Sequence, residues 1–193
     1  MKTAGILCLA AISVSLFCAA GFAAMSDKDG ELLNAALTGN KANVEKYLRR
    51  GAFINAKGEN AKTPLILAIE NEHPDVAELL IKKGANVNFA DNNGMTPLMF
   101  AAQKGQANIV KLLLSKRANP NVQQSNIKSV YATANMTALM FAVESGKSEI
   151  VRMLIEAGVN VNKKNRDGKT ALVIAEEKDD STIIDILVKA GAR

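Results

Sequence analysis

A short apolar pattern, Leu-x-x-Ala, returns at nearly constant intervals along the chain. The leucine stands at positions 32, 65, 98, 139 and 172, so successive copies are 33, 33, 41 and 33 residues apart. A second marker, a glycine or arginine followed by Ala or Val, stands at positions 51, 84, 117, 158 and 191 and gives the same intervals. Two markers that agree over five copies predict a repeat protein, in which each unit buries its apolar face against its neighbours.

Each copy also carries residues that begin and end helices. A threonine precedes four of the apolar runs, at positions 63, 96, 137 and 170, where its hydroxyl can cap the first turn of a helix. Pro64 and Pro97 follow two of these threonines, at the first helical position, where a missing N–H has no cost. Glycine closes the second helix in four copies, because it adopts the left-handed backbone conformation freely. Arg117 takes that place in the third copy, so we expect a helix end that is strained or differently shaped.

The motifs within the copies resemble those of ankyrin repeats. The matching segments are Thr63-Pro64-Leu65, Thr96-Pro97-Leu98, Thr137-Ala138-Leu139 and Thr170-Ala171-Leu172, with the tails Gly84-Ala85-Asn86-Val87-Asn88 and Gly158-Val159-Asn160-Val161-Asn162. The resemblance implies an all-α fold, an ankyrin-repeat solenoid of five helix-turn-helix repeats joined by short β-hairpin-like loops. We expect this domain to occupy residues 24–193. Its repeats are expected at about residues 29–57, 58–90, 91–123, 132–164 and 165–193.

The single interval of 41 residues marks an insertion. Eight extra residues lie between Ala118 and Thr137, in the loop that joins repeats three and four. The inserted segment is mostly polar, yet it includes Ile127 and Tyr131. Insertions in repeat proteins map to one face, which is often the binding face. The segment is therefore either part of a binding surface or a tolerated surface loop, since lengthening a loop costs little free energy.

The first residues form a different kind of segment. After Lys2, residues 6–24 contain no charged side chain, and small residues gather near the end of this stretch. The pattern is typical of a signal peptide, which we expect to occupy residues 1–23 with cleavage near Ala23. Both cysteines, Cys8 and Cys18, would be removed with it. We therefore expect a periplasmic or secreted protein of bacterial type, with an N-terminal membrane anchor as the alternative.

The chain offers few residues for catalysis or for a cofactor. Its only histidine, His73, falls between two expected helices, where a structural role is favoured, and no cysteine follows position 18. The glycines follow the repeat, and the pairs Lys147-Ser148 and Lys169-Thr170 lack the glycine that a phosphate-binding loop has six positions before its lysine. The turn that begins at Asp91 lacks the spacing and the final glutamate of an EF-hand calcium loop. We therefore predict no enzyme activity, no cofactor and no metal site.

The basic balance of the chain, a formal net charge of +5, permits an anionic partner without requiring one. Lys82 and Lys116 stand near expected helix ends, where a cation also complements the helix dipole. Acidic neighbours such as Glu78 interrupt the basic residues, and aromatic side chains for stacking on bases are few. We expect no nucleic-acid partner, and no stable membrane insertion once the leader is removed.

The resemblance implies that the protein binds another protein, as a monomer and without catalysis, in the cell envelope or outside the cell. The candidate contact residues are apolar side chains of the loops and polar side chains of the inner helices: Phe53, Phe89, Ile127, Tyr131, Glu70, Gln103, Lys104 and Glu144. Phe100 and Phe141 are assigned to the core instead, because they share the register of Leu67 and Ile174. Two alternatives stay open: a passive protein that stabilises the envelope, and an intracellular scaffold or effector whose leader is no signal.

Overall fold

The computed structural model describes residues 27–124 and 135–193. Their helices are α2 (Asp27–Leu37), α3 (Lys41–Arg49), η1 (Glu59–Ala61, a 3-10 helix), α4 (Pro64–Glu70), α5 (Pro74–Lys82), α6 (Pro97–Lys104), α7 (Ala107–Ser115), α8 (Ala138–Glu144), α9 (Ser148–Glu156), α10 (Ala171–Glu177) and α11 (Ser181–Lys189). Within these residues no helix is long and apolar enough to cross a membrane. The expected signal peptide at residues 1–23, and the candidate contacts Ile127 and Tyr131, lie outside the described residues.

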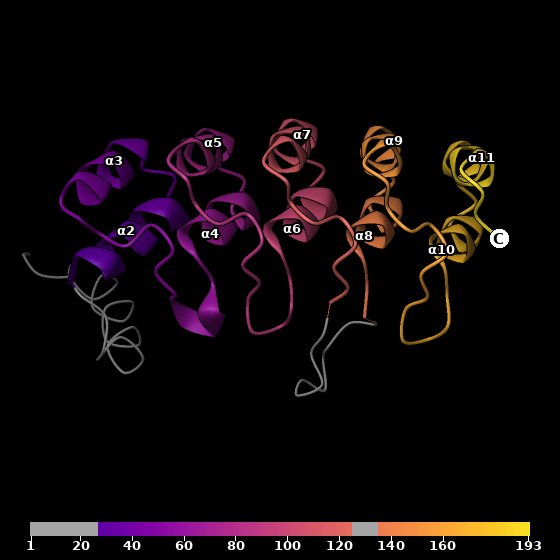
Figure 1. Ribbon diagram of the computed structural model, residues 1–193, viewed down its shortest axis with the longest axis horizontal. Helices are drawn as coiled ribbons and strands as arrows, with labels where there is room; N and C mark the ends of the chain where they lie inside the picture. The colour runs from indigo at the N-terminus through magenta and orange to yellow at the C-terminus, as the bar shows by residue number, and fades with distance from the viewer. Residues whose placement is uncertain (1–26, 125–134) are drawn as a thin grey trace, which may run out of the picture.

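The helices stack as consecutive pairs along one axis (Figure 1). One row contains the first helix of each pair, α2, α4, α6, α8 and α10, which we call the inner helices. The other row contains α3, α5, α7, α9 and α11, the outer helices. Each helix packs against its partner in the pair and against the equivalent helix of the next pair. The all-α, stacked architecture predicted from the repeat is confirmed.

The threonines begin the inner helices as predicted. The side-chain oxygen of Thr63 accepts a hydrogen bond from the backbone N–H of Ile66 at 3.3 Å. Thr96, Thr137 and Thr170 make the same bond to the residue three positions later. Each bond satisfies one of the N–H groups that a helix leaves without a partner in its first turn. The start of α4, α6, α8 and α10 is thus fixed by a local contact that the sequence itself specifies.

The outer helices end in a residue with left-handed backbone conformation. Gly51, Gly84, Gly158 and Gly191 have φ of 79°, 89°, 77° and 85°. Arg117 has φ of 62° at the equivalent position, and Ala118 N–H still donates to the Leu113 carbonyl at 3.0 Å, as in the other pairs. The helix end of the third pair therefore keeps its shape. A side chain in this conformation carries a steric penalty of about 1–2 kcal/mol, so the expected strain is present without a change of shape.

The core runs without a break through the stack. Leu80 and Leu113 of the outer helices are fully buried, and Ala68 and Ala101 of the inner helices let neighbouring helices approach closely. Phe100 and Phe141 are buried too, which confirms their assignment to the core. Because each pair covers the apolar face of the next, no pair is a complete folding unit on its own.

The loops between pairs are turns closed by a backbone hydrogen bond. Gly58 N–H donates to the Lys62 carbonyl at 2.9 Å, and Asp91 and Asn165 close their turns in the same way. In the third loop Gln124 N–H donates to the Met136 carbonyl at 2.9 Å, across a gap that is eight residues longer. The base of this loop therefore keeps the geometry of the others, and the extra residues fall between Gln124 and Met136 in the sequence.

A ladder of asparagine side chains ties successive pairs together. The side-chain oxygen of Asn88 accepts from the backbone N–H of Asn119 at 2.9 Å, and that of Asn121 accepts from Asn160 N–H at 2.8 Å. Asn55 makes the same bond one pair earlier, and Asn162 makes it one pair later. Each of these bonds joins two residues that are 31 to 39 positions apart in the sequence. The ladder thus holds the loops of neighbouring pairs in a fixed relation.

Candidate functional site

Four of the predicted contact residues lie together at the carboxyl ends of consecutive inner helices. Glu70 ends α4, Gln103 and Lys104 end α6, and Glu144 ends α8. Ser145, directly after α8, donates from its hydroxyl to the Gln103 carbonyl at 2.9 Å, so the ends of α6 and α8 are adjacent. We call Glu70, Gln103, Lys104 and Glu144 the inner-end surface. It is formed because the repeat places equivalent residues side by side on neighbouring helices.

An ion pair occupies the inner-end surface at α4. Lys62 Nζ lies 2.7 Å from both carboxylate oxygens of Glu70. The same ammonium lies 5.9 Å from the centroid of the Phe100 ring, which belongs to the next pair. Lys62 stands just before the capping Thr63, so its side chain reaches along the whole of α4 to the glutamate. Glu70 is thus already neutralised by its own chain.

A second pair with the same geometry lies at α10. Lys169 Nζ lies 2.6 Å from a carboxylate oxygen of Glu177, and again the lysine precedes the capping threonine by one position. The hydrogen bond that the Lys169 ammonium donates to the Glu177 carboxylate raises the pKa of Lys169 above its ordinary value. Because folding favours the charged amine, the contribution of this pair is present at neutral pH and is lost as the pH rises through that pKa.

The two middle pairs lack this lysine. Met95 and Met136 stand where Lys62 and Lys169 stand, and both methionines are buried. Glu144 is consequently exposed, with no ion-pair partner in the part of the chain that the structure describes. In α6 the equivalent residue is the neutral Gln103, which is exposed as well. Glu144 of the inner-end surface is therefore a free carboxylate, on a helix between those of the two neutralised glutamates, Glu70 and Glu177.

Lys104 has a looser contact than the two lysines of the ion pairs. Its Nζ lies 3.5 Å from a carboxylate oxygen of Glu72, whose side chain is largely exposed. A contact of this kind at the surface contributes little to stability, because water screens it. Lys104 can therefore leave Glu72 and bind an anionic group of a partner with little loss of free energy.

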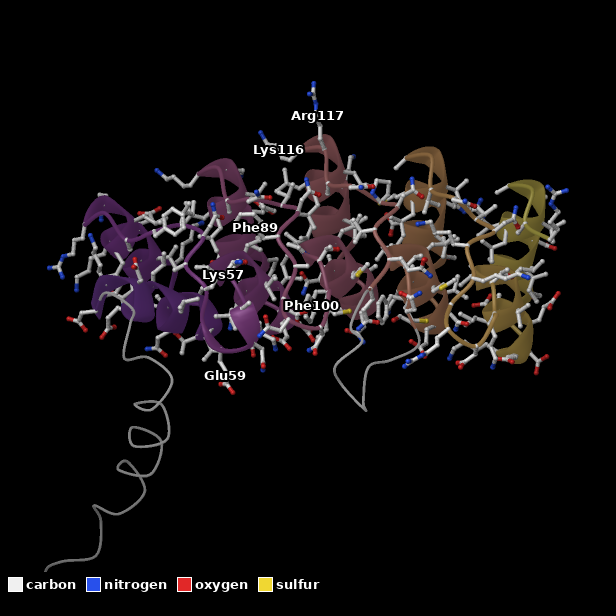
Figure 2. The ribbon with its side chains drawn as sticks, turned by 60° about the horizontal axis from the view of Figure 1, so that its bottom comes forward. Lys57, Glu59, Phe89, Phe100, Lys116 and Arg117 are labelled. Carbon is white, nitrogen blue, oxygen red and sulfur yellow. The ribbon has the colours of Figure 1, made fainter. Side chains whose placement is uncertain are left out.

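The two loop phenylalanines lie apart from the inner-end surface. Phe53, 61% exposed, donates from its N–H to Asp29 near the amino end of α2, which is the opposite end of the inner helices. Phe89 is 37% exposed, and the Lys57 ammonium lies 5.5 Å from its ring centroid (Figure 2). The structure therefore brings together the polar candidates Glu70, Gln103, Lys104 and Glu144 but not the aromatic ones.

The Lys–Glu pairs were missed by reasoning from the sequence. Their signature is a lysine directly before the capping threonine and a glutamate eight positions after that lysine, as in Lys62 and Glu70. Alignment of the copies by position shows this signature in the second and fifth copies only. Position-by-position comparison of charge between copies would have found both the pairs and the unpaired Glu144.

The histidine His73, which lies outside the inner-end surface, has a structural role. The His73 ring nitrogen Nε2 lies 3.1 Å from the Leu37 carbonyl of the preceding pair, so this side chain contributes to the contact between pairs. Among the described residues no group of three or more His, Cys, Asp or Glu side chains could hold a metal ion. The candidate site is therefore an extended surface made by equivalent positions of stacked helices.

Comparison with known proteins agrees with this geometry. A family model described as ankyrin repeats in three copies matches residues 32–124 and 124–193. No curated protein matches the chain. Ankyrin repeats are in general non-catalytic modules that mediate protein–protein interaction. Since the two matched segments cover well over half of its length, the chain belongs to the ankyrin-repeat family.

Proposed function

We propose that this protein binds another protein through the inner-end surface, and that Glu144 is the centre of the contact. The observation that carries the proposal is the free carboxylate of Glu144, between two equivalent glutamates that are each held by a lysine. A cation of the partner takes the place over Glu144 that Lys62 and Lys169 take over their own glutamates. Lys104 and Gln103 add a cation and an amide beside it, which suits a partner surface of mixed polarity.

The surface suits recognition of a protein rather than a small molecule. It extends over the ends of three adjacent helices, and Phe100 and Phe141 of two of these helices are buried in the core. A rigid, packed base holds the exposed polar groups in place before binding, so little conformational entropy is lost when a partner docks.

We also propose that the protein acts outside the cytoplasm, in the periplasm or beyond it. The support is the leader: one lysine, an uncharged stretch at residues 6–24, and small residues before a cleavage site near Ala23. Amino-terminal sequencing of the protein accumulated in an exporting bacterial host tests this proposal. A start at Ala24 or close to it is expected, whereas a start at Met1 in a soluble fraction would overturn export.

Affinity capture from a cell-envelope extract tests the binding proposal. The bait is the wild-type chain, with Glu144→Lys as the variant and Glu156→Lys as the matched control, since Glu156 is exposed at the end of the outer helix α9. We expect a partner that is retained by the wild type and the control and is lost with Glu144→Lys. Retention of the same proteins by all three baits would contradict the role of Glu144.

The same affinity-capture experiment tests whether the inserted segment contributes to partner binding. A chain without residues 126–133 has the 33-residue interval of the other copies and keeps the closing bond between Gln124 and Met136. If the inserted segment forms part of the contact, this variant loses the partner that Glu156→Lys retains. If it is a tolerated loop, capture is unchanged and the inner-end surface alone accounts for binding.

A further inference from the structure

Six exposed cations line the carboxyl ends of the first three outer helices. They are Arg49, Arg50, Lys82, Lys83, Lys116 and Arg117, and we call them the basic rim. Because α3, α5 and α7 pack side by side, the three helix ends lie along one edge of the stack. Figure 2 shows Lys116 and Arg117 projecting beyond the ribbon on the side opposite to Glu59. Neighbouring helices are about 8–10 Å apart, so the cations form a closely spaced row.

The opposite ends of the helices carry charges of both signs. The turns between inner and outer helices have exposed carboxylates, among them Glu72, Asp75, Glu144, Glu149 and Asp179, and exposed lysines, Lys41, Lys104, Lys147 and Lys178. At the rim positions of the first three pairs no acidic residue occurs, and only Lys82 has a close acidic neighbour, Glu78 at 3.2 Å. The basic rim is therefore an edge of a single sign of charge, whereas the opposite edge is mixed.

Complementing the helix dipoles does not account for the whole rim. A cation in the last turn of a helix is favourable, which explains Arg49 and Lys82. The helix dipole requires no second cation at the carboxyl end of each outer helix. It also leaves Arg117 unexplained, because this residue holds a left-handed backbone at φ of 62° where the other pairs have glycine. A strained residue that persists is a reason to look for a function, and here the strain places a cation at the projecting edge.

We propose that the basic rim docks the protein on a bilayer surface that contains anionic phospholipids. Exposed cations along one edge can approach a plane of phosphate groups, and each Lys or Arg near such a surface contributes about 1 kcal/mol, or roughly fivefold in partition. Phe53, 61% exposed and two residues beyond Gly51, lies close in sequence to the rim and suits the interface between headgroups and acyl chains.

Other anionic partners fit the rim less well. Single-stranded nucleic acid is bound by cations interleaved with aromatic side chains, whereas the rim has Phe53 beside its first segment only, and the segments at residues 82–85 and 115–118 contain no aromatic residue. A protein interface concentrates its energy in apolar or aromatic anchors at its centre, which these segments also lack. Contact with the bilayer by the rim leaves the inner-end surface, at the other ends of the helices, accessible to its own partner.

Vesicle partitioning of the full chain tests the proposal. Neutral phosphatidylcholine vesicles are compared with vesicles containing about 30 mol% phosphatidylglycerol, at low and at high salt. The readout is the partition coefficient for anionic vesicles divided by that for neutral vesicles. An uncharged segment such as residues 6–24 contributes to both coefficients, so its effect cancels in the ratio. The wild type is expected to prefer the anionic vesicles strongly at low salt and to lose most of this preference at about 0.5 M salt.

The test variant replaces the four rim cations farthest from the carboxylates of α2, as K82Q/K83Q/K116Q/R117Q. Four charges at roughly fivefold each predict that the ratio falls by at least about 100-fold. The matched control, K41Q/K164Q/R166Q/K178Q, removes the same charge from exposed residues outside the rim and is expected to keep the ratio within about fivefold. A third variant, K82R/K83R/K116R/R117K, keeps the charge and is expected to behave like the wild type.

Circular dichroism on each variant establishes that the fold is intact. The proposal is overturned if the rim and control variants lower the ratio equally, or if the wild type shows no preference for anionic vesicles. It is also overturned if the rim binds polyglutamate or single-stranded DNA while ignoring the anionic vesicles. Capture through Glu144 is expected to survive the rim substitutions, so failure of one proposal leaves the other intact.

Discussion

Single residues decide where each helix of this array begins and ends. The threonine caps and the closing glycines act through bonds within a few positions, so their roles could be predicted from the sequence and are confirmed. Arg117 shows the limit of that reasoning. The sequence identified an exception, but whether the chain would change shape or accept strain depends on the packing of Ala118 and Leu113 around it, which a local pattern does not contain.

Replacing Arg117 by glycine is expected to stabilise the fold. Glycine removes a steric penalty of about 1–2 kcal/mol at φ of 62°, and its greater freedom in the unfolded chain offsets part of that gain. We predict a rise of about 0.5–1 kcal/mol in the free energy of unfolding by urea titration. Arg152→Gly, in the interior of α9, is the control and is expected to destabilise by about 1 kcal/mol. A loss of stability with Arg117→Gly would show that the arginine makes a compensating contact.

Replacing a fully buried leucine of an outer helix is expected to have a large effect. Leu80→Ala or Leu113→Ala removes side-chain atoms that are wholly inaccessible to water and leaves a cavity between stacked pairs. We predict a loss of about 2–5 kcal/mol in the free energy of unfolding. Leu37→Ala is the matched control, because Leu37 is 43% exposed and is expected to lose less than about 1 kcal/mol. Equal losses at buried and exposed positions would contradict the packing described here.

At the scale of the element, the loops and their hydrogen bonds couple one helical pair to the next. The length and place of the insertion followed from the intervals alone, since eight extra residues had to lie between Ala118 and Thr137. That the base of the loop is unchanged could not be predicted, because only the bond between Gln124 and Met136 in the structure shows it. The Lys62–Glu70 pair was missed because a contact across eight positions of a helix follows no simple local pattern.

The asparagine ladder is expected to carry part of the coupling between pairs. Asn121→Ala removes the acceptor of Asn160 N–H and a bond to the Gly158 carbonyl at 3.3 Å. We predict a loss of about 1–2 kcal/mol in the free energy of unfolding, measured by thermal or urea denaturation. Asn108→Ala, at an exposed position of α7, should change stability by less than about 0.5 kcal/mol. Similar effects at both asparagines would argue that the ladder adds nothing to the stack.

Removal of residues 126–133 is expected to leave the fold intact. The shortened loop would still be closed by Gln124 and Met136, and Asn135, at φ of 56°, would occupy the place of Gly94 in the preceding loop. Closing a shorter loop costs less entropy, by about 1 kcal/mol for this change in length, so we predict an unchanged or slightly higher melting temperature. Cooperative unfolding at a clearly lower temperature would show that the inserted residues pack against the array.

At the scale of the whole molecule, stacking turns equivalent residues into continuous surfaces. The fold class and the placement of Glu70, Gln103, Lys104 and Glu144 beside one another could be predicted, because a repeat assigns every copy the same geometry. The aromatic candidates Phe53 and Phe89 could not be placed in this way, since loops lack that regular register. The basic rim emerged only when the ends of α3, α5 and α7 were considered together as one edge of the stack.

The central claim is that Glu144, the unpaired member of a set of equivalent glutamates, anchors the partner. The most direct test is the dissociation constant of the captured partner, measured by calorimetry for Glu144→Gln and for Glu177→Gln, whose carboxylate is already held by Lys169. A charged hydrogen bond to the partner is worth about 1.5–3 kcal/mol, so Glu144→Gln is expected to weaken binding at least about tenfold, and Glu177→Gln by less than about twofold. Equal dissociation constants for the two variants would contradict the account.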